Sequence, residues 1–195
     1  MANLHPFSIY QIPYSVVPSE KISTFGAYRL FVTGKRTAPG IEGITRNGRI
    51  EQWCSLAAKN FHLQNLEVIY KSPFDNYVSW EHFQKHGERF IWSIIKAEEI
   101  QKTKSDMSRL LEEVKADPDA ISTLFGLDFT NYHGKRILGG ADVAQALEKS
   151  SDSPDPIFHE GDSTLEFFSL LKALISYFDL ALANNRAIII GKWAA

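Results

Sequence analysis

The hydrophobic pattern near the end of the chain predicts one long helix over residues 163–183. Polar side chains recur there every three or four residues, from Glu166 to Asp179, and form a single narrow stripe. Apolar side chains take up the remaining surface, so the helix should be buried on more than one side, either by the protein core alone or also by a second subunit or a partner. The side chains that we expect to be nearly inaccessible are Leu171, Leu174, Ile175 and Phe178.

Apolar periodicity near 3.6 residues, together with capping signals, predicts five further helices. They cover residues 50–61, 79–87, 106–115, 117–125 and 142–149. Runs rich in aromatic and β-branched residues predict five strands. They cover residues 7–17, 25–32, 66–70, 90–95 and 187–193. Prolines at positions 6, 13 and 18 favour an edge strand or an extended arm for the first of them.

The predicted elements alternate irregularly, and no Gly-rich first turn follows the first strand, which argues against a doubly wound parallel sheet. We therefore predict the α+β class. Residues 1–195 would form a single domain in which a small, mostly antiparallel sheet packs against several helices, including the long C-terminal core helix. Two loops, 34–49 and 150–162, are marked by glycine or proline. The first could instead be a short hairpin that closes on Asn47–Gly48.

Composition narrows the class of protein. The 195 residues are 44% hydrophobic and 12% aromatic, which excludes a disordered chain, and the net charge of −2 excludes a generally basic nucleic-acid binder. Cys54 is the single cysteine, so no internal disulfide can form. The N-terminal residues lack a secretory signal pattern, and charges interrupt the most apolar stretch. We therefore expect a cytoplasmic protein that does not enter the membrane.

Charge is distributed unevenly along the chain. Residues 1–75 contain eight Lys/Arg and five Asp/Glu, whereas the remainder contains 13 and 18. The two predicted loops concentrate opposite signs and are the candidate partner-binding sites, because a patch of one sign steers a partner of the other. Their charged residues are Lys35, Arg36, Arg46 and Arg49 in the first loop, and Asp152, Asp155, Glu160 and Asp162 in the second. No aromatic–basic stacking segment accompanies the cations, which argues against nucleic acid.

No catalytic constellation stands out in the sequence. His82 and His86 are one helical turn apart, but Phe83 occupies the position that the H-E-x-x-H motif of metalloproteases gives to glutamate. Cys54 lies on the apolar side of its predicted helix, eight residues before His62, and we expect it to be a small buried hydrophobe rather than a nucleophile. We therefore assign no catalytic residue, no metal site and no cofactor.

These features favour a non-enzymatic cytosolic protein that binds another protein, since aromatic and arginine side chains anchor protein interfaces. A regulatory protein, or an immunity protein or antitoxin whose partner is a toxin, would fit this description. Two alternatives remain open. One is a small enzyme that acts on an anionic metabolite through the basic Gly-rich loop and a histidine base. The other is a homo-oligomeric structural protein.

Overall fold

The computed structural model describes residues 7–19, 22–44, 48–69, 89–125, 145, 148 and 164–194. The chain divides into two compact units. The first consists of Met1–Arg46, Val68–Gln101 and Phe178–Ala195, and the second consists of Asn47–Glu67 and Lys102–Tyr177. This division does not test the expected single domain of residues 1–195, which stays a prediction.

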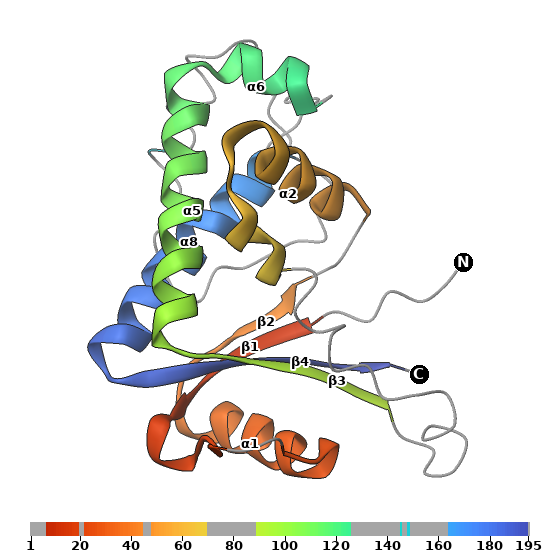
Figure 1. Cartoon of the computed structure of the whole chain (residues 1–195), viewed down its shortest axis with the longest axis vertical. Coiled ribbons are helices and arrows are strands. Elements are labelled where there is room, and N and C mark those ends of the chain that lie inside the picture. Colours follow the sequence, from red (N-terminus) through yellow and green to blue (C-terminus); the bar gives the residue numbers. More distant parts are fainter. Residues whose placement is uncertain are drawn as a thin grey trace. The chain divides into compact units, whose positions relative to one another are not determined.

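The first unit contains a four-stranded antiparallel sheet (Figure 1). Its strands are β1 (Phe7–Pro13), β2 (Ile41–Ile44), β3 (Arg89–Ile95) and β4 (Arg186–Ala194), in the order β2-β1-β4-β3. Sheet and helices occur together, so the predicted α+β class with an antiparallel sheet is confirmed. The edge position expected for the first strand is wrong, because β1 pairs with both β2 and β4. Pro13 is the last residue of β1 and therefore does not interrupt the pairing.

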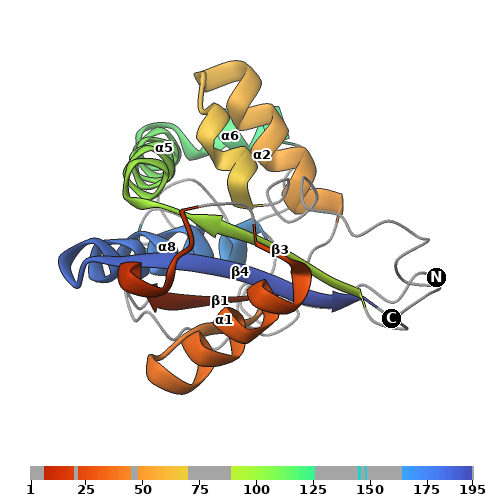
Figure 2. The same cartoon turned by 60° about the horizontal axis from the view of Figure 1, so that its bottom comes forward.

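Helix α1 (Thr24–Thr37) lies against one face of this sheet (Figure 2). The strand expected at residues 25–32 is therefore wrong. The Oγ atom of Ser23 accepts a hydrogen bond from the Gly26 N–H at 3.1 Å and caps the start of the helix. On the inner side of the helix, Ala27 and Phe31 join a buried cluster with Tyr10 and Phe90.

Both faces of the sheet are buried. Residues that alternate along β1 and β4 point to opposite faces, and Ile12 and Ile189 belong to the cluster beneath α1. Ile9 and Ile190, on the other face, are each only 1% exposed. A strand buried on both faces reads as a continuous apolar run, which is what residues 187–190 show in the sequence.

The second unit contains helices α2 (Gly48–Phe61) and α6 (Pro118–Phe125). It also holds most of α5 (Ala97–Ala116) and α8 (Thr164–Ala183), whose remaining turns belong to the first unit. All four were predicted, although α5 begins nine residues earlier than expected. The predicted cap of α6 is confirmed, because Asp117 Oδ1 accepts a hydrogen bond from the Ala120 N–H at 3.0 Å.

The predicted burial of α8 is largely confirmed. Leu171, Leu174 and Phe178 are at most 1% exposed, whereas Ile175 is only half-buried. Asn185 ends the helix region with a φ of 51°, and β4 begins at the next residue. No helix in the described part of the chain combines the length and hydropathy that a bilayer crossing needs.

Four further predictions concern short segments. Residues 66–70, expected as a strand, fall largely within η2, a 3-10 helix of Gln64–Ile69. The helix expected at 79–87 and the loop at 150–162 lie outside the described residues. Of the helix expected at 142–149, Gln145 and Glu148 are described, and both are helical.

Candidate functional site

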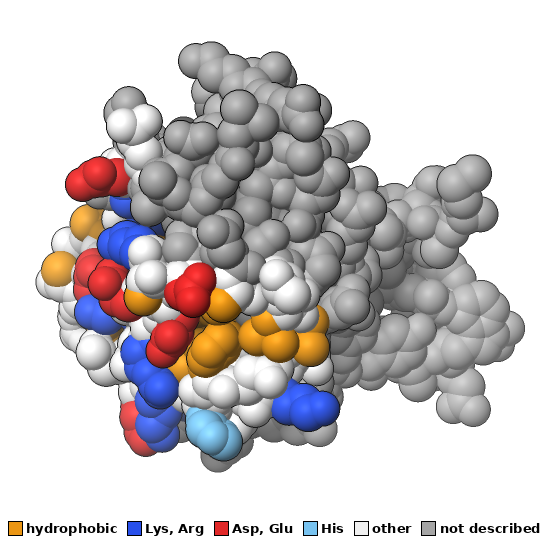
Figure 3. Space-filling model, turned by 90° about the horizontal axis from the view of Figure 1, so that it is seen from above, with side chains coloured by type: hydrophobic (Ala, Val, Ile, Leu, Met, Phe, Trp, Pro, Cys, Tyr) orange, Lys and Arg blue, Asp and Glu red, His pale blue; other side chains and the backbone are white. Residues whose placement is uncertain are grey.

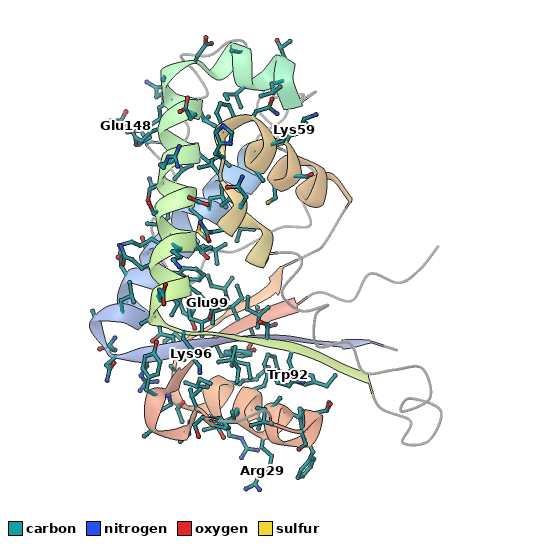
Figure 4. The ribbon with its side chains drawn as sticks, viewed as in Figure 1. Arg29, Lys59, Trp92, Lys96, Glu99 and Glu148 are labelled. Atoms are coloured by element: carbon teal, nitrogen blue, oxygen red, sulfur yellow. The ribbon has the colours of Figure 1, made fainter. Side chains whose placement is uncertain are left out.

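The outer side of α1 carries a row of four residues that we call the α1 stripe: Phe25, Arg29, Val32 and Arg36. Their spacing of four, three and four residues places them on one side of the helix, over about 16 Å of its length. Phe25 is 68% exposed, more than any other large hydrophobic residue in the described part of the chain. The side chain of Arg29 points away from the sheet (Figure 4). Both arginines are exposed and Val32 is half-buried.

The orientation of the α1 stripe is set by the opposite side of the helix. Ala27, Phe31 and Gly34 are buried there. The ring of Phe31 meets the rings of Tyr10 and Phe90 edge to face, with centroid distances of 4.8 and 5.1 Å. Aromatic pairs in this geometry attract each other beyond their burial of area, so the rotation of α1 about its own axis is fixed.

Gly34 lets α1 lie close against β1. A Cβ atom at this position would be 2.8 Å from the Cβ of Tyr10 and 3.1 Å from Cγ2 of Ile12, too near for any larger residue without a shift. The helix cannot turn its outer side inward without losing this close approach. The exposure of Phe25 therefore follows from tight packing on the other side.

The α1 stripe carries positive charge that nothing on α1 offsets. The helix contains no acidic residue. The guanidinium groups of Arg29 and Arg36 form no ion pair or hydrogen bond with any residue that the structure describes. By contrast, acidic and basic side chains lie interspersed over the described surface that Figure 3 displays. The α1 stripe is therefore a local patch of one sign with an aromatic residue at one end.

Lys35 differs from these two arginines because it already has a partner. Its Nζ atom lies 3.2 Å from Oε1 of Glu42 on β2, and Oε1 also accepts a hydrogen bond from the buried hydroxyl of Tyr10 at 2.5 Å. That hydrogen bond, followed by Lys35, lowers the pKa of Glu42 below its ordinary value. Burial, and then the interaction with Glu42, raise the pKa of Tyr10 far above its usual range. Tyr10 therefore stays protonated near neutral pH, and the three groups link α1, β1 and β2 rather than forming a general base.

The predicted basic loop at 34–49 is wrong, because residues 38–40 alone separate α1 from β2. Lys35 and Arg36 lie in the last turn of α1, whereas Arg49 lies in the first turn of α2 in the other compact unit. Arg46 lies outside the described residues. The hairpin alternative is wrong too, since β2 pairs with β1. The acidic candidates Asp152, Asp155, Glu160 and Asp162 also lie outside the described residues.

Among the described residues, the candidates for catalysis do not form a site. Cys54 is fully buried on α2, as expected for a small hydrophobe. His62 is exposed and ends α2 with a φ of 55°. His82 and His86 lie outside the described residues. Within the described ranges, no group of three or more His, Cys, Asp or Glu side chains could hold a metal ion.

The described part of the second unit contains one buried acidic residue with a clear structural partner. Asp106 on α5 is 5% exposed, and its Oδ2 accepts hydrogen bonds from the backbone and side-chain nitrogens of Asn65, both at 2.9 Å. The Thr103 hydroxyl donates to the Asn65 carbonyl at 3.4 Å. These bonds hold η2 on α5 and leave Asp106 without the features of a catalytic carboxylate.

Comparisons with protein-family models, with curated proteins and with solved structures found no match to this chain. Of the α1 stripe, only Arg36 was among the residues that the sequence predicted for partner binding. The signal for the rest was Ser23 followed by buried residues at a spacing of four and three, which is typical of a capped helix.

Proposed function

We propose that this protein acts by binding another protein through the α1 stripe. The observation that carries the proposal is the 68% exposure of Phe25, with exposed arginines at positions 29 and 36 on the same side of the helix that pair with no described acidic residue. Aromatic and arginine side chains are the residues most often found at the energetic centres of protein interfaces.

The energetics favour a contact at Phe25. Full burial of a phenylalanine side chain contributes about 1.5–3 kcal/mol, so covering the exposed two thirds would contribute about 1–2 kcal/mol to binding. A guanidinium adds directed hydrogen bonds to a carboxylate on the partner. One aromatic and two arginines over about 16 Å of helix form an anchor of ordinary size for a transient interface.

Site-specific photo-crosslinking tests the proposal. A benzophenone amino acid replaces Phe25, and the same amino acid at Leu124, an exposed hydrophobic residue of the second unit, serves as the matched control. After irradiation in the native lysate, we expect one defined cross-linked protein from position 25 and none from position 124. The product should disappear when both Arg29 and Arg36 are replaced by Glu. Equal products from the two positions, or a product indifferent to the charge reversal, would refute the proposal.

A further inference from the structure

We infer that the partner presents an acidic amphipathic α-helix to the α1 stripe, a conclusion that rests on the proposed function. The spacing of Phe25, Arg29, Val32 and Arg36 carries it. Four, three and four residues is the interval at which one helix meets another along a shared seam. The seam alternates an apolar residue with a cation: Phe25, then Arg29, then Val32, then Arg36.

The alternation of apolar and cationic residues determines which side chains the partner helix must present. Apolar side chains must face Phe25 and Val32 to exclude water from them, and carboxylates must face the two arginines so that no charge is left unpaired in the interface. A helix with Leu and Glu alternating at the same intervals meets both requirements. Lys35 does not join this seam, because Glu42 already holds it.

A second copy of the chain does not fit the same surface. Packed in parallel, two α1 stripes would place guanidinium groups opposite one another. Packed antiparallel, they would place each guanidinium opposite Phe25 or Val32, and α1 has no acidic residue to pair with it. Like charges facing each other at an interface cost several kcal/mol. Nucleic acid is also a poor match, since Phe25 and Val32 alternate with the cations and would face a charged phosphate backbone.

The probe for this inference is a fluorescein-labelled 21-residue peptide with Leu and Glu alternating at intervals of four and three and Ala between them. Two peptides serve as controls. One has the same residues in scrambled order, and the other has Lys in place of every Glu. Fluorescence anisotropy against the full-length protein should give saturable binding of the Leu/Glu peptide. The scrambled and Lys peptides should bind at least tenfold more weakly.

Matched protein variants locate the contact. The double variant with Arg29→Glu and Arg36→Glu should bind the Leu/Glu peptide at least tenfold more weakly. The same variant should bind the Lys peptide, because the charges on both sides are then reversed. The control, Lys59→Glu with Lys96→Glu, changes the net charge equally through two exposed lysines outside α1, one on α2 and one between β3 and α5, and should change binding less than twofold. The difference in peptide binding between the arginine variant and this control should shrink as the salt concentration rises, because salt screens exposed charges. Far-UV circular dichroism confirms that both variants are folded.

The outcomes separate this inference from the proposed function. Absence of saturable binding below about 1 mM peptide, equal binding of the scrambled peptide, or equal weakening by the lysine control would overturn the acidic helix as partner. If the cross-link from position 25 still forms, the α1 stripe is a protein-binding surface for a partner of another kind. If the cross-link fails as well, the proposed function falls with the inference.

Discussion

Replacing Phe31 by Ala tests the packing that orients α1. Phe31 is 9% exposed and its ring stacks edge to face on two other rings, at centroid distances of 4.8 and 5.1 Å. Truncation of a buried phenylalanine costs about 3–5 kcal/mol through lost transfer free energy and the cavity that remains. We expect the upper part of this range, because each aromatic pair contributes about 0.5–1.5 kcal/mol beyond its buried area.

Phe25→Ala is the matched control, since it makes the same chemical change on the same helix. Phe25 is 68% exposed, so only about a third of the 1.5–3 kcal/mol available from full burial is at stake, or about 0.5–1 kcal/mol. Alanine is also the better helix former by about half a kcal/mol, which offsets most of that loss. The free energy of unfolding should therefore change by less than about 0.5 kcal/mol.

Urea unfolding followed by circular dichroism measures both changes, with an unchanged dependence on denaturant concentration as the check that the unfolded state is the same. The pair distinguishes the helix from the strand that the sequence suggested. In a strand, residues 25 and 31 would share one face, so both substitutions would be costly. In the helix, six positions amount to a rotation of about 240°, which separates them. A loss at Phe25→Ala that equals the loss at Phe31→Ala would refute the helix and the exposed stripe together.

Three further substitutions test other parts of the structure. Gly34→Ala should lower the free energy of unfolding by about 1–3 kcal/mol, because the added methyl would lie 2.8 Å from a β1 side chain. Gly26→Ala is its control in the same urea titration and should be neutral or stabilising, because the added methyl meets ordinary contacts of 3.4 Å or more. Asp106→Ala should lower the melting temperature by the equivalent of about 1.5–3 kcal/mol, since it leaves two nitrogens of Asn65 without their charged acceptor. Glu42→Gln should remove stability at pH 7, and this loss should shrink as the pH falls. The folded state holds the pKa of Glu42 below its ordinary value of 4.5, so its contribution is present above that value and is lost as the pH falls through the lowered pKa. A stability difference between wild type and this variant that does not change with pH would contradict the assignment.

The elements that the sequence predicted correctly are those whose hydrophobic pattern suits one geometry alone. On α5, the buried residues Met107, Leu110, Leu111 and Val114 repeat at three, one and three, which no strand can place on one face. The run from Ala187 to Ile190 is apolar at every position, as a strand buried on both faces requires. Asp117 before Pro118 marked the boundary between two helices because both residue types favour the first turn.

The strand prediction for residues 66–70 failed for a different reason. Its composition is typical of a strand, but Leu66 donates its N–H to the Leu63 carbonyl at 3.1 Å and the chain turns into η2. Contacts far along the sequence stabilise that turn, because Asp106 accepts from the N–H of Asn65. Local propensity cannot reveal an acceptor 41 residues away, and β propensity depends on such surroundings more than helix propensity does.

The charged residues show what charge counting can and cannot predict. Lys35 and Arg36 are adjacent in sequence and both cationic, so the sequence ranked them equally. The structure separates them, because Lys35 is bound to Glu42 while Arg36 meets no described partner. The difference arises from their helical positions, about 100° apart, which the sequence yields only once the segment is known to be a helix.

The error at residues 25–32 also hid the surface on which the proposed function depends. Phe25, Ala27 and Phe31 alternate as a strand would require, and with both rings on the same buried face no exposed aromatic would remain. In the helix, these residues lie on two different sides. Ala27 and Phe31 pack on the sheet, while Phe25 lies with Arg29 on the outer side. Two glycines, at 26 and 34, lowered the apparent helix propensity of this segment. Gly34 is required by the close approach of α1 to β1. The same residue therefore lowers the helix propensity of the segment and helps to fix which side of the helix faces outward.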